Sequence, residues 1–209
     1  MFLKKVTLGS LLLASGLAHA DDMQALEHFL KHVQFARGQF TQVVTSPPKQ
    51  GETVGKRKTS SGEFAIARPN KFRFDYKKPF EQLMVSDGQT LWVYDADLQQ
   101  LTQRKLAEVV SGTPAVLLTG SNRAELEKSF VLKSLPDKDG LQWVQATPRA
   151  KDTSIASVEL GFESGSTGRI AALNVLDGFG QVSQMKLMQV SYEAVPAQLF
   201  VYRAGKAAP

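Results

Sequence analysis

The sequence contains no cysteine among its 209 residues. This absence excludes disulfide bonds, thiol chemistry and the attachment of a lipid to an N-terminal cysteine. A chain without disulfides must be stabilised by its own apolar core. The length suits one domain with a core of substantial size.

Histidine is scarce, and two of the three histidines, His28 and His32, stand four residues apart in "HFLKH". On a helix this spacing could in principle bind a metal from one face. A metalloprotease helix, however, needs Glu directly after the first histidine, and Phe29 stands there. The G-x-S-x-G motif of serine hydrolases is also absent from the sequence. We therefore expect a solvated helix face, with no metal, no cofactor and no enzymatic activity.

The sequence has only one extended apolar run, residues 6–17, and it is too short to span a bilayer. Lys4 and Lys5 precede the run, and Ala18-His19-Ala20 follows it as a small-x-small cleavage site. These features predict a signal peptide over residues 1–20, cut between Ala20 and Asp21, and a mature periplasmic domain over 21–209. A retained membrane anchor is the alternative interpretation.

Strong charge of one sign is absent as well. The chain has 25 basic and 20 acidic residues, which gives a formal net charge of +5. Part of this excess lies in the predicted signal peptide, so the mature domain is more nearly balanced. A balance this mild does not indicate a nucleic-acid partner.

The order of apolar residues predicts one amphipathic helix followed by many strands. Apolar residues recur at helical spacing after Asp21 and Asp22, which are placed to cap a helix start; they are Met23, Leu26, Phe29 or Leu30, and Val33. From Gly38 onward, short runs rich in β-branched and aromatic residues alternate with turn residues. We expect strands near 38–46, 60–67, 70–77, 80–86, 89–95, 129–135, 141–147, 154–163, 169–176, 181–191 and 197–203.

Turn chemistry supports an antiparallel order of these strands. Asp87-Gly88, Asp139-Gly140 and Asp177-Gly178 are dipeptides typical of hairpins, because glycine accepts a positive φ angle. One segment breaks the series: residues 105–128 have helical spacing, with Thr113 as a cap, Pro114 at the first helical position and Gly120 as a stop.

The stretch "RPNKFRFDY" at 68–76 is the densest aromatic signal. On a strand, Phe72, Phe74 and Tyr76 share one face, because side chains alternate. A sheet of about ten strands curls, and its apolar face must be covered, for which the two helical segments are available. The sequence thus predicts a mainly β protein: a single curved antiparallel sheet covered by amphipathic helices. Composition alone favours a filled core over a cavity on the covered face.

Three longer segments carry a resemblance to a known family: "RPNKFRFDY..PFEQLMVSDGQTLWVYD" (68–95), "TPAVLL" (113–118) and "PAQLFVY" (196–202). With them the chain strongly resembles the LolA family of periplasmic outer-membrane lipoprotein carrier proteins, from the N-terminal helix to the C-terminal strand. The loop at 45–59 and the tail after Tyr202 match poorly. The resemblance implies an incomplete, unclosed β-barrel with an α-helical lid, which encloses an apolar cavity for acyl chains.

The resemblance also implies site residues. An arginine at the position of Arg68 holds the lid closed in that family when the cavity is empty; a surface cation is the alternative. We expect the acyl-chain cavity to be lined by Phe40, Phe64, Phe72, Phe74, Tyr76, Met84, Leu91 and Trp92. We expect the apolar face of the lid to comprise Leu26, Leu30, Val33, Val116 and Leu117. In the 80–95 hairpin, either Met84 with Leu91 or Leu83 with Trp92 could be the inward pair.

Partners follow from the same resemblance. Family members accept lipoproteins from the inner-membrane ABC transporter LolCDE and pass them to the outer-membrane receptor LolB. LolB shares the fold but is anchored through an N-terminal cysteine, which this chain lacks, so the sequence favours carrier over receptor. We expect a monomer. A carrier for another amphiphile, such as a glycolipid, and a secreted lipid hydrolase remain as alternative interpretations.

Overall fold

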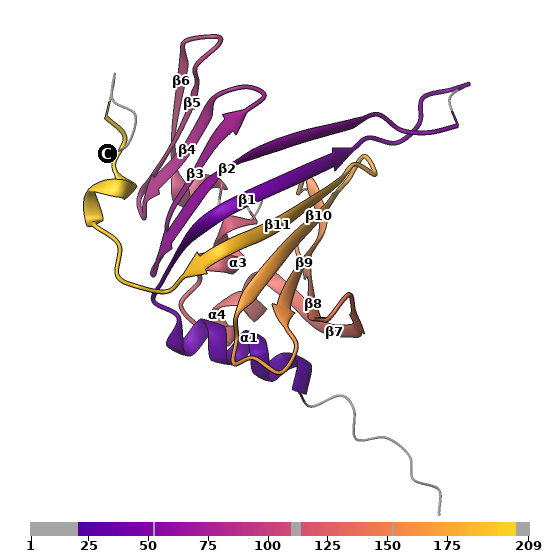
Figure 1. Cartoon of the computed structure of the whole chain (residues 1–209), viewed down its shortest axis with the longest axis vertical. Helices are drawn as coiled ribbons and strands as arrows, with labels where there is room; N and C mark the ends of the chain where they lie inside the picture. Colours follow the sequence, from indigo (N-terminus) through magenta and orange to yellow (C-terminus); the bar gives the residue numbers. More distant parts are fainter. Residues whose placement is uncertain (1–20, 52, 110–113, 152, 204–209) are drawn as a thin grey trace, which may run out of the picture.

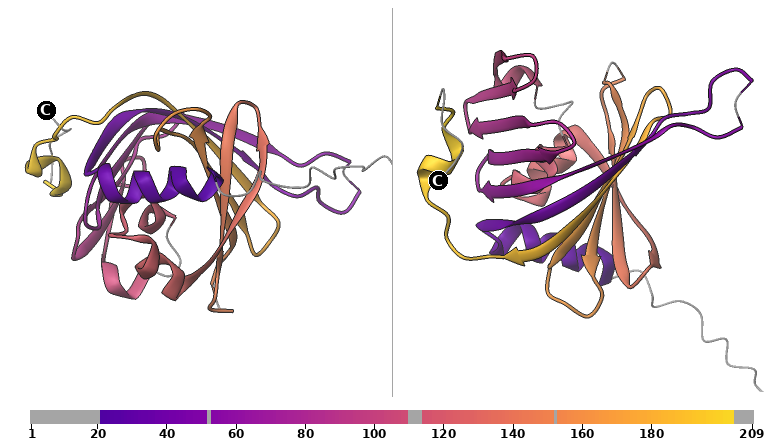
Figure 2. Two further views of the ribbon diagram at one scale, coloured as in Figure 1. Left: turned by 90° about the horizontal axis from the view of Figure 1, so that it is seen from below. Right: turned by 45° about the horizontal axis from the view of Figure 1, so that its top comes forward.

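The computed structural model describes residues 21–203, apart from 52, 110–113 and 152. The predicted signal peptide and the predicted cap Thr113 therefore lie outside the described residues. The described chain forms one large antiparallel sheet that arches over a group of short helices (Figure 1). In the view from below, α1 lies across the concave side of the arch, beside the helices of the central segment (Figure 2).

Ten of the predicted strands are present, with bounds that differ by a few residues. The strands of the sheet are β1 (Phe35–Thr45), β2 (Arg57–Ala67), β3 (Lys71–Lys78), β4 (Gln82–Asp87), β5 (Thr90–Asp95), β6 (Gln100–Lys105), β7 (Phe130–Lys138), β8 (Leu141–Pro148), β9 (Ile155–Glu163), β10 (Ile170–Asp177) and β11 (Val182–Ser191). The helices are α1 (Asp21–His32), α2 (Leu106–Val109), α3 (Ala115–Thr119) and α4 (Arg123–Ser129). The predicted interruption of the sheet by helices in mid-chain is confirmed.

The sheet is open. Its strand order is β6-β5-β4-β3-β2-β1-β11-β10-β9-β8-β7, so β6 and β7 are its two edges and do not pair with one another. The N-terminal and C-terminal strands β1 and β11 meet in the middle, where Phe40 lies opposite Leu187. The predicted fold class, a single curved sheet that forms an unclosed barrel covered by helices, is confirmed.

Strand register aligns the aromatic residues in rows across the concave face. Phe64 lies opposite Phe74, and Phe74 lies opposite Met84 on the next strand. Gly62 stands between Phe40 and Tyr76 in the neighbouring row. A Cβ atom at Gly62 would lie 2.1 Å from the carbonyl oxygen of Asp75, so the close approach of β2 and β3 at this point requires glycine.

The C-terminal segment differs from the prediction. We expected a strand at 197–203, but residues Ala197–Phe200 form a short 3-10 helix, η2, on the outer, convex face of the sheet. Phe200 and Val195 are buried there against the small side chains of Ala65 and Ala67. The predicted strand at 197–203 is therefore wrong: the segment packs on the sheet through Phe200 and does not extend it.

Strand β6 was not predicted. Its sequence, "QLTQRK", lacks alternating polarity, and all six residues are exposed. The strand forms because it pairs with β5, with Val93 opposite Thr102, and not because it buries an apolar face. Polar edge strands of this kind protect a sheet from pairing with other chains.

Candidate functional site

The predicted aromatic set comes together on the concave face. Phe40, Phe64, Phe72 and Phe74 are buried in one core cluster, and Tyr76 packs against it. The ring centroid of Phe40 lies 6.0 Å from that of Phe74 and 4.9 Å from that of Tyr76, both edge to face. Phe74 also contacts the rings of Phe64, at 6.2 Å, and Phe72, at 6.3 Å. Aromatic residues of β1, β2 and β3 thus converge on Phe74.

The β4–β5 hairpin resolves the choice that the sequence left open. Met84 lies opposite Phe74, Leu91 lies opposite Ser86, and both face the concave core. Trp92 lies opposite Val85, on the other face of the sheet. The prediction that Trp92 lines the cavity is wrong. Leu83 and Trp92 form the outward pair because side chains alternate and the two-residue turn fixes the register.

The helices contribute the other half of the same core. Leu26, Phe29 and Leu30 of α1 and Leu117 and Leu118 of α3 are buried against the sheet, and Val33 packs on it partly buried. The side chain of Val116, which was predicted to belong to the lid, is not among those that the structure describes. Among the described residues, these helix side chains and the aromatic residues of the sheet form one buried cluster on the concave face.

Arg68 connects both helices to the sheet. It lies in the turn between β2 and β3, and its Nε donates to the carbonyl oxygen of Val33 at 2.7 Å. Its Nη1 donates to the carbonyl oxygen of Gly120. Val33 follows the last residue of α1, and Gly120 follows the last residue of α3. Carbonyls at helix C-termini lack helical partners and carry the negative end of the dipole, so they suit a guanidinium.

Backbone hydrogen bonds of the same turn also connect it to the ends of α1 and α3. The amide of Arg68 donates to the carbonyl of Gln34 at 2.9 Å, and the amide of Asn70 donates to that of Thr119 at 3.2 Å. Asn70 has a φ angle of 60°, which asparagine tolerates better than most residues. The turn Arg68-Pro69-Asn70, called the RPN turn below, therefore contacts the ends of α1 and α3 through both main chain and side chain.

The environment of the Arg68 guanidinium is largely apolar. Its central carbon lies 4.7 Å from the ring centroid of Phe29, and its Nη2 is buried without a hydrogen-bond partner among the described residues. Burial lowers the pKa of Arg68 to about 10. The side chain is still charged at neutral pH, and its unpaired buried donor opposes the gain from its hydrogen bonds.

A second contact between helices was not found from the sequence. Arg123, at the start of α4, forms ion pairs with Glu27 of α1 and with Glu127, the latter at 2.7 Å. The Arg123–Glu127 spacing of four residues is a recognisable helical pair. The link to Glu27 joins segments far apart in the chain, and nothing in the sequence indicates it.

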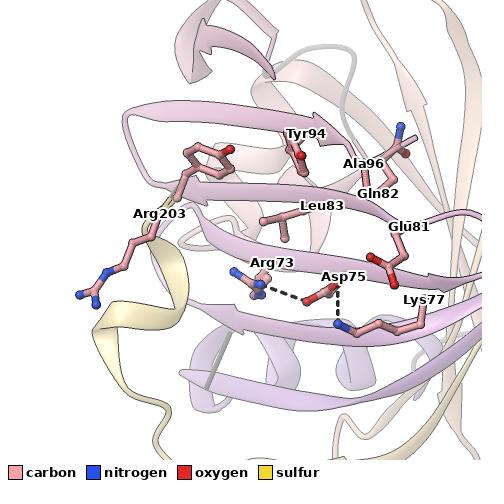
Figure 3. Close-up of a pocket in the computed structure, with 10 residues that line it drawn as sticks. Arg73, Asp75, Lys77, Glu81, Gln82, Leu83, Tyr94, Ala96 and Arg203 are labelled. Carbon is pink, nitrogen blue, oxygen red and sulfur yellow. Dashed lines mark hydrogen bonds and ion pairs between the residues drawn. The ribbon is translucent and has the colours of Figure 1, made fainter. Parts of the chain in front are cut away.

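The convex face has a different chemistry. Figure 3 shows Arg73, Asp75 and Lys77, which alternate with the aromatic residues of β3 and point outward. Asp75 accepts from Arg73 and pairs with Lys77, each at 3.0 Å. The small outer pocket that they line, about 170 Å³, is bordered by Tyr202 and Arg203 of the C-terminal segment. Its charged lining does not suit acyl chains.

Two searches of the described residues bear on other functions. No group of three or more His, Asp or Glu side chains in that part of the chain could hold a metal ion. None of its helices is long and apolar enough to cross a membrane.

Comparison with known proteins identifies the family. The family described as outer membrane lipoprotein carrier protein LolA matches residues 31–203. The chain belongs to the LolA family. Its LolA-family relatives include an outer-membrane lipoprotein carrier protein from Methylibium petroleiphilum, 48% identical over 197 residues that cover 94% of this chain and 92% of that protein. Another, from Albidiferax ferrireducens, is 46% identical and covers 90% of each chain.

Solved structures support the fold alone. A conserved protein from Thermus thermophilus superposes with a TM-score of 0.50 at 13% sequence identity, over 88% of this chain and 94% of that one. Membership of the LolA family makes this chain a lipoprotein carrier. The family consists of carriers and not of enzymes, which agrees with the poor match to hydrolase and metalloprotease motifs.

Proposed function

We propose that the protein works in the periplasm and binds the acyl chains of outer-membrane lipoproteins on its concave face, after α1 and α3 have moved away as a lid. One observation carries this proposal. The most apolar surface of the molecule is covered by helices whose ends are held by hydrogen bonds from a single turn. Such a cover can be removed without breaking the sheet.

The energetics favour exchange over permanent binding. Burial of each methylene group contributes about 0.8 kcal/mol, so a triacylated lipoprotein needs a cover in water. In this structure, Leu26, Phe29 and Leu117 cover the aromatic face. The net binding free energy of the cargo is the difference between the contacts that it makes and the helix contacts that it replaces. The cost of ordering the acyl chains reduces this free energy further. Binding and release can therefore both proceed.

Arg68 sets the balance in this proposal. Its hydrogen bonds to Val33 and Gly120 exist only while both helix ends lie against the β2–β3 turn. They stabilise the empty, closed state and oppose the loaded, open one. Arg68 therefore acts as the lid lock, and it promotes release of cargo.

The remaining parts of the proposal concern the route. The signal peptide is removed between Ala20 and Asp21, and the protein acts as a monomer. Cargo comes from the inner-membrane transporter LolCDE and passes to the outer-membrane receptor LolB. No nucleic acid, cofactor, metal or catalytic step takes part.

Mass spectrometry of lipids and proteins that co-purify with the carrier from the periplasm tests the function directly. We expect triacylated lipoproteins, released when the carrier is mixed with soluble LolB. Co-purification of glycolipids without lipoprotein would overturn the cargo assignment in favour of another amphiphile. Turnover of an ester substrate by the purified protein would overturn the absence of catalysis.

A further inference from the structure

A groove lies at the end of the concave face that is remote from Arg68. Strand β3 begins beside the RPN turn and ends at Lys78, and its eight residues separate the two ends by roughly 25 Å. The groove has a volume of about 430 Å³ and is bordered by the turns that follow β3 and β5. Its lining includes Gln42, Tyr76, Phe80, Gln82, Asp97 and Leu98.

This groove continues the apolar core. Tyr76 belongs to both, because its ring lies 4.9 Å from that of Phe40 inside the core while it also lines the groove. Tyr76 lies opposite Gln82 on β4, and both follow the Phe74–Met84 row toward the end of the sheet. The concave face thus changes from wholly apolar to amphipathic along its length.

The floor of the groove carries amide and hydroxyl groups. Gln42 donates to the Oγ of Ser183 at 2.6 Å. Burial raises the pKa of Tyr76, and the neighbouring Gln42 side chain offsets part of that rise. Gln82 stands beside them with a carboxamide that can donate and accept. Two acidic residues, Asp95 and Asp97, complete the rim, and no basic side chain of the described residues lines the groove. The lining suits neutral polar groups and repels anions.

Two exposed apolar side chains, those of Phe80 and Leu98, flank the groove. Phe80 is 67% exposed and Leu98 is 70% exposed, although both are large hydrophobic residues. Asp95 accepts a hydrogen bond from the amide of Leu98 at 3.0 Å, which fixes the turn that presents this side chain. Neither side chain supports the core, so their position beside a polar floor indicates contact with an amphipathic ligand.

We propose that this groove binds the polar junction of an acylated cargo, the ester and amide groups that link the acyl chains to the peptide. This inference rests on the proposed function, because it requires acyl chains on the concave face. The chains extend from the groove toward Phe74, and the carboxamides of Gln42 and Gln82 donate to the carbonyls of the junction. Phe80 and Leu98 cover the first methylene groups. The peptide leaves the carrier at the end remote from Arg68.

The order of polar and apolar groups favours this direction. A lipopeptide is apolar at its chain ends, neutral and polar at its junction, and hydrated beyond it. The face from Phe72 through Tyr76 to the groove has the same order. The opposite end is covered by α1 and α3, whose terminal carbonyls are already bound by the RPN turn. An anionic headgroup, such as a free carboxylate or a phosphate, meets Asp95 and Asp97 and is excluded.

Binding of two probes to variants of the full mature chain tests the assignment. One probe is a synthetic tripalmitoyl lipopeptide with an uncharged peptide, and the other is palmitate, which has a chain but no junction. Displacement of an apolar dye reports both. We expect Phe80→Ser and Gln82→Leu each to weaken lipopeptide binding about three- to tenfold, the range of one lost contact. Palmitate binding should change less than about twofold.

Phe179→Ser is the matched control. Phe179 is 85% exposed on the turn between β10 and β11 and does not line the groove. Its replacement should alter neither probe. Asp97→Asn should strengthen palmitate binding, because it removes a charge at the rim of the groove that repels the carboxylate.

Each other outcome overturns the proposal. Unchanged lipopeptide binding by both Phe80→Ser and Gln82→Leu would show that the junction lies elsewhere. Equal losses for the two probes would show that the groove contacts chains only. If the parent protein binds neither probe, the proposed function fails as well, whereas normal binding by every variant refutes the groove alone. Phe80 is exposed, so its variant remains informative even if Gln82→Leu unfolds.

Discussion

Arg68 and Gly120 are joined by a hydrogen bond from guanidinium to carbonyl, although they stand 52 positions apart in the chain. The bond connects a turn of the sheet to the end of α3, and the Arg68–Val33 bond does the same for α1. The Arg68 side chain therefore contacts the C-terminal ends of two helices at once. If either helix leaves the sheet, Arg68 loses a partner.

Replacing Arg68 should separate loading from release. We expect Arg68→Leu to accept lipoprotein from LolCDE but to pass it poorly to LolB, because the closed state loses charge-assisted bonds worth roughly 2–4 kcal/mol before water compensates. Arg68→Lys should be intermediate, since an ammonium keeps the charge without the planar set of donors. Transfer of labelled lipoprotein from purified carrier to soluble LolB measures both effects. Unloading as fast and as complete as that of the parent would show that Arg68 is not the lid lock.

The ion pairs of Arg123 should matter much less. Arg123 and Glu27 are 40% and 50% exposed, and pairs of this kind contribute about 0–1 kcal/mol. We expect Arg123→Ala to lower the free energy of unfolding by less than about 1 kcal/mol and to leave transfer to LolB unchanged. Denaturant unfolding and the same transfer assay check this. A transfer defect as large as that of Arg68→Leu would mean that the lid has a second lock.

A charge at Phe74 should prevent loading. Phe74 is buried at the meeting point of the aromatic contacts, so Phe74→Glu places an unpaired carboxylate on the concave face. We expect a large loss of dye and lipoprotein binding, together with lower stability. Phe179→Glu, on an exposed turn, is the control and should bind normally. A folded Phe74→Glu protein that loads cargo at the parent level would show that this face is not the binding face.

Substitutions in the β4–β5 hairpin test which of its side chains point to the concave face. Leu91 lies in the concave core and Trp92, its neighbour, lies on the convex face. We expect Leu91→Gln to weaken binding of an apolar dye several-fold and Trp92→Gln to leave it unchanged. Thermal unfolding of both variants serves as the control for folding. The reverse order of effects would mean that Leu83 and Trp92 form the inward pair.

The elements that the sequence predicted well are those in which local pattern and tertiary burial agree. The sequence predicted both strand β3 and the shared face of its aromatic residues, because Phe72, Phe74 and Tyr76 alternate with charged residues. All three lie on the concave side. In β4 and β5 both faces carry apolar residues, because η2 and the C-terminal segment cover the convex side. Alternation therefore could not determine which of Leu91 and Trp92 points inward.

Other differences have their cause in contacts distant in sequence. The 197–203 segment has strand-like composition but packs on the small residues Ala65 and Ala67, which no local pattern reveals. Strand β6 is polar because it is an edge, so it resembles a loop. The hydrogen bonds of Arg68 were anticipated only through family resemblance, since an arginine before proline carries no sign of its partners.

The free edges of the sheet have a mechanical consequence. In a closed barrel, strand number and stagger fix the circumference, so the interior cannot enlarge unless ladder hydrogen bonds break. Here β6 and β7 are not paired, and every other neighbouring pair of strands is. A change of twist can move β6 away from β7 while every ladder stays intact. The circumference of this open sheet is therefore not fixed by ladder hydrogen bonds between its two edges.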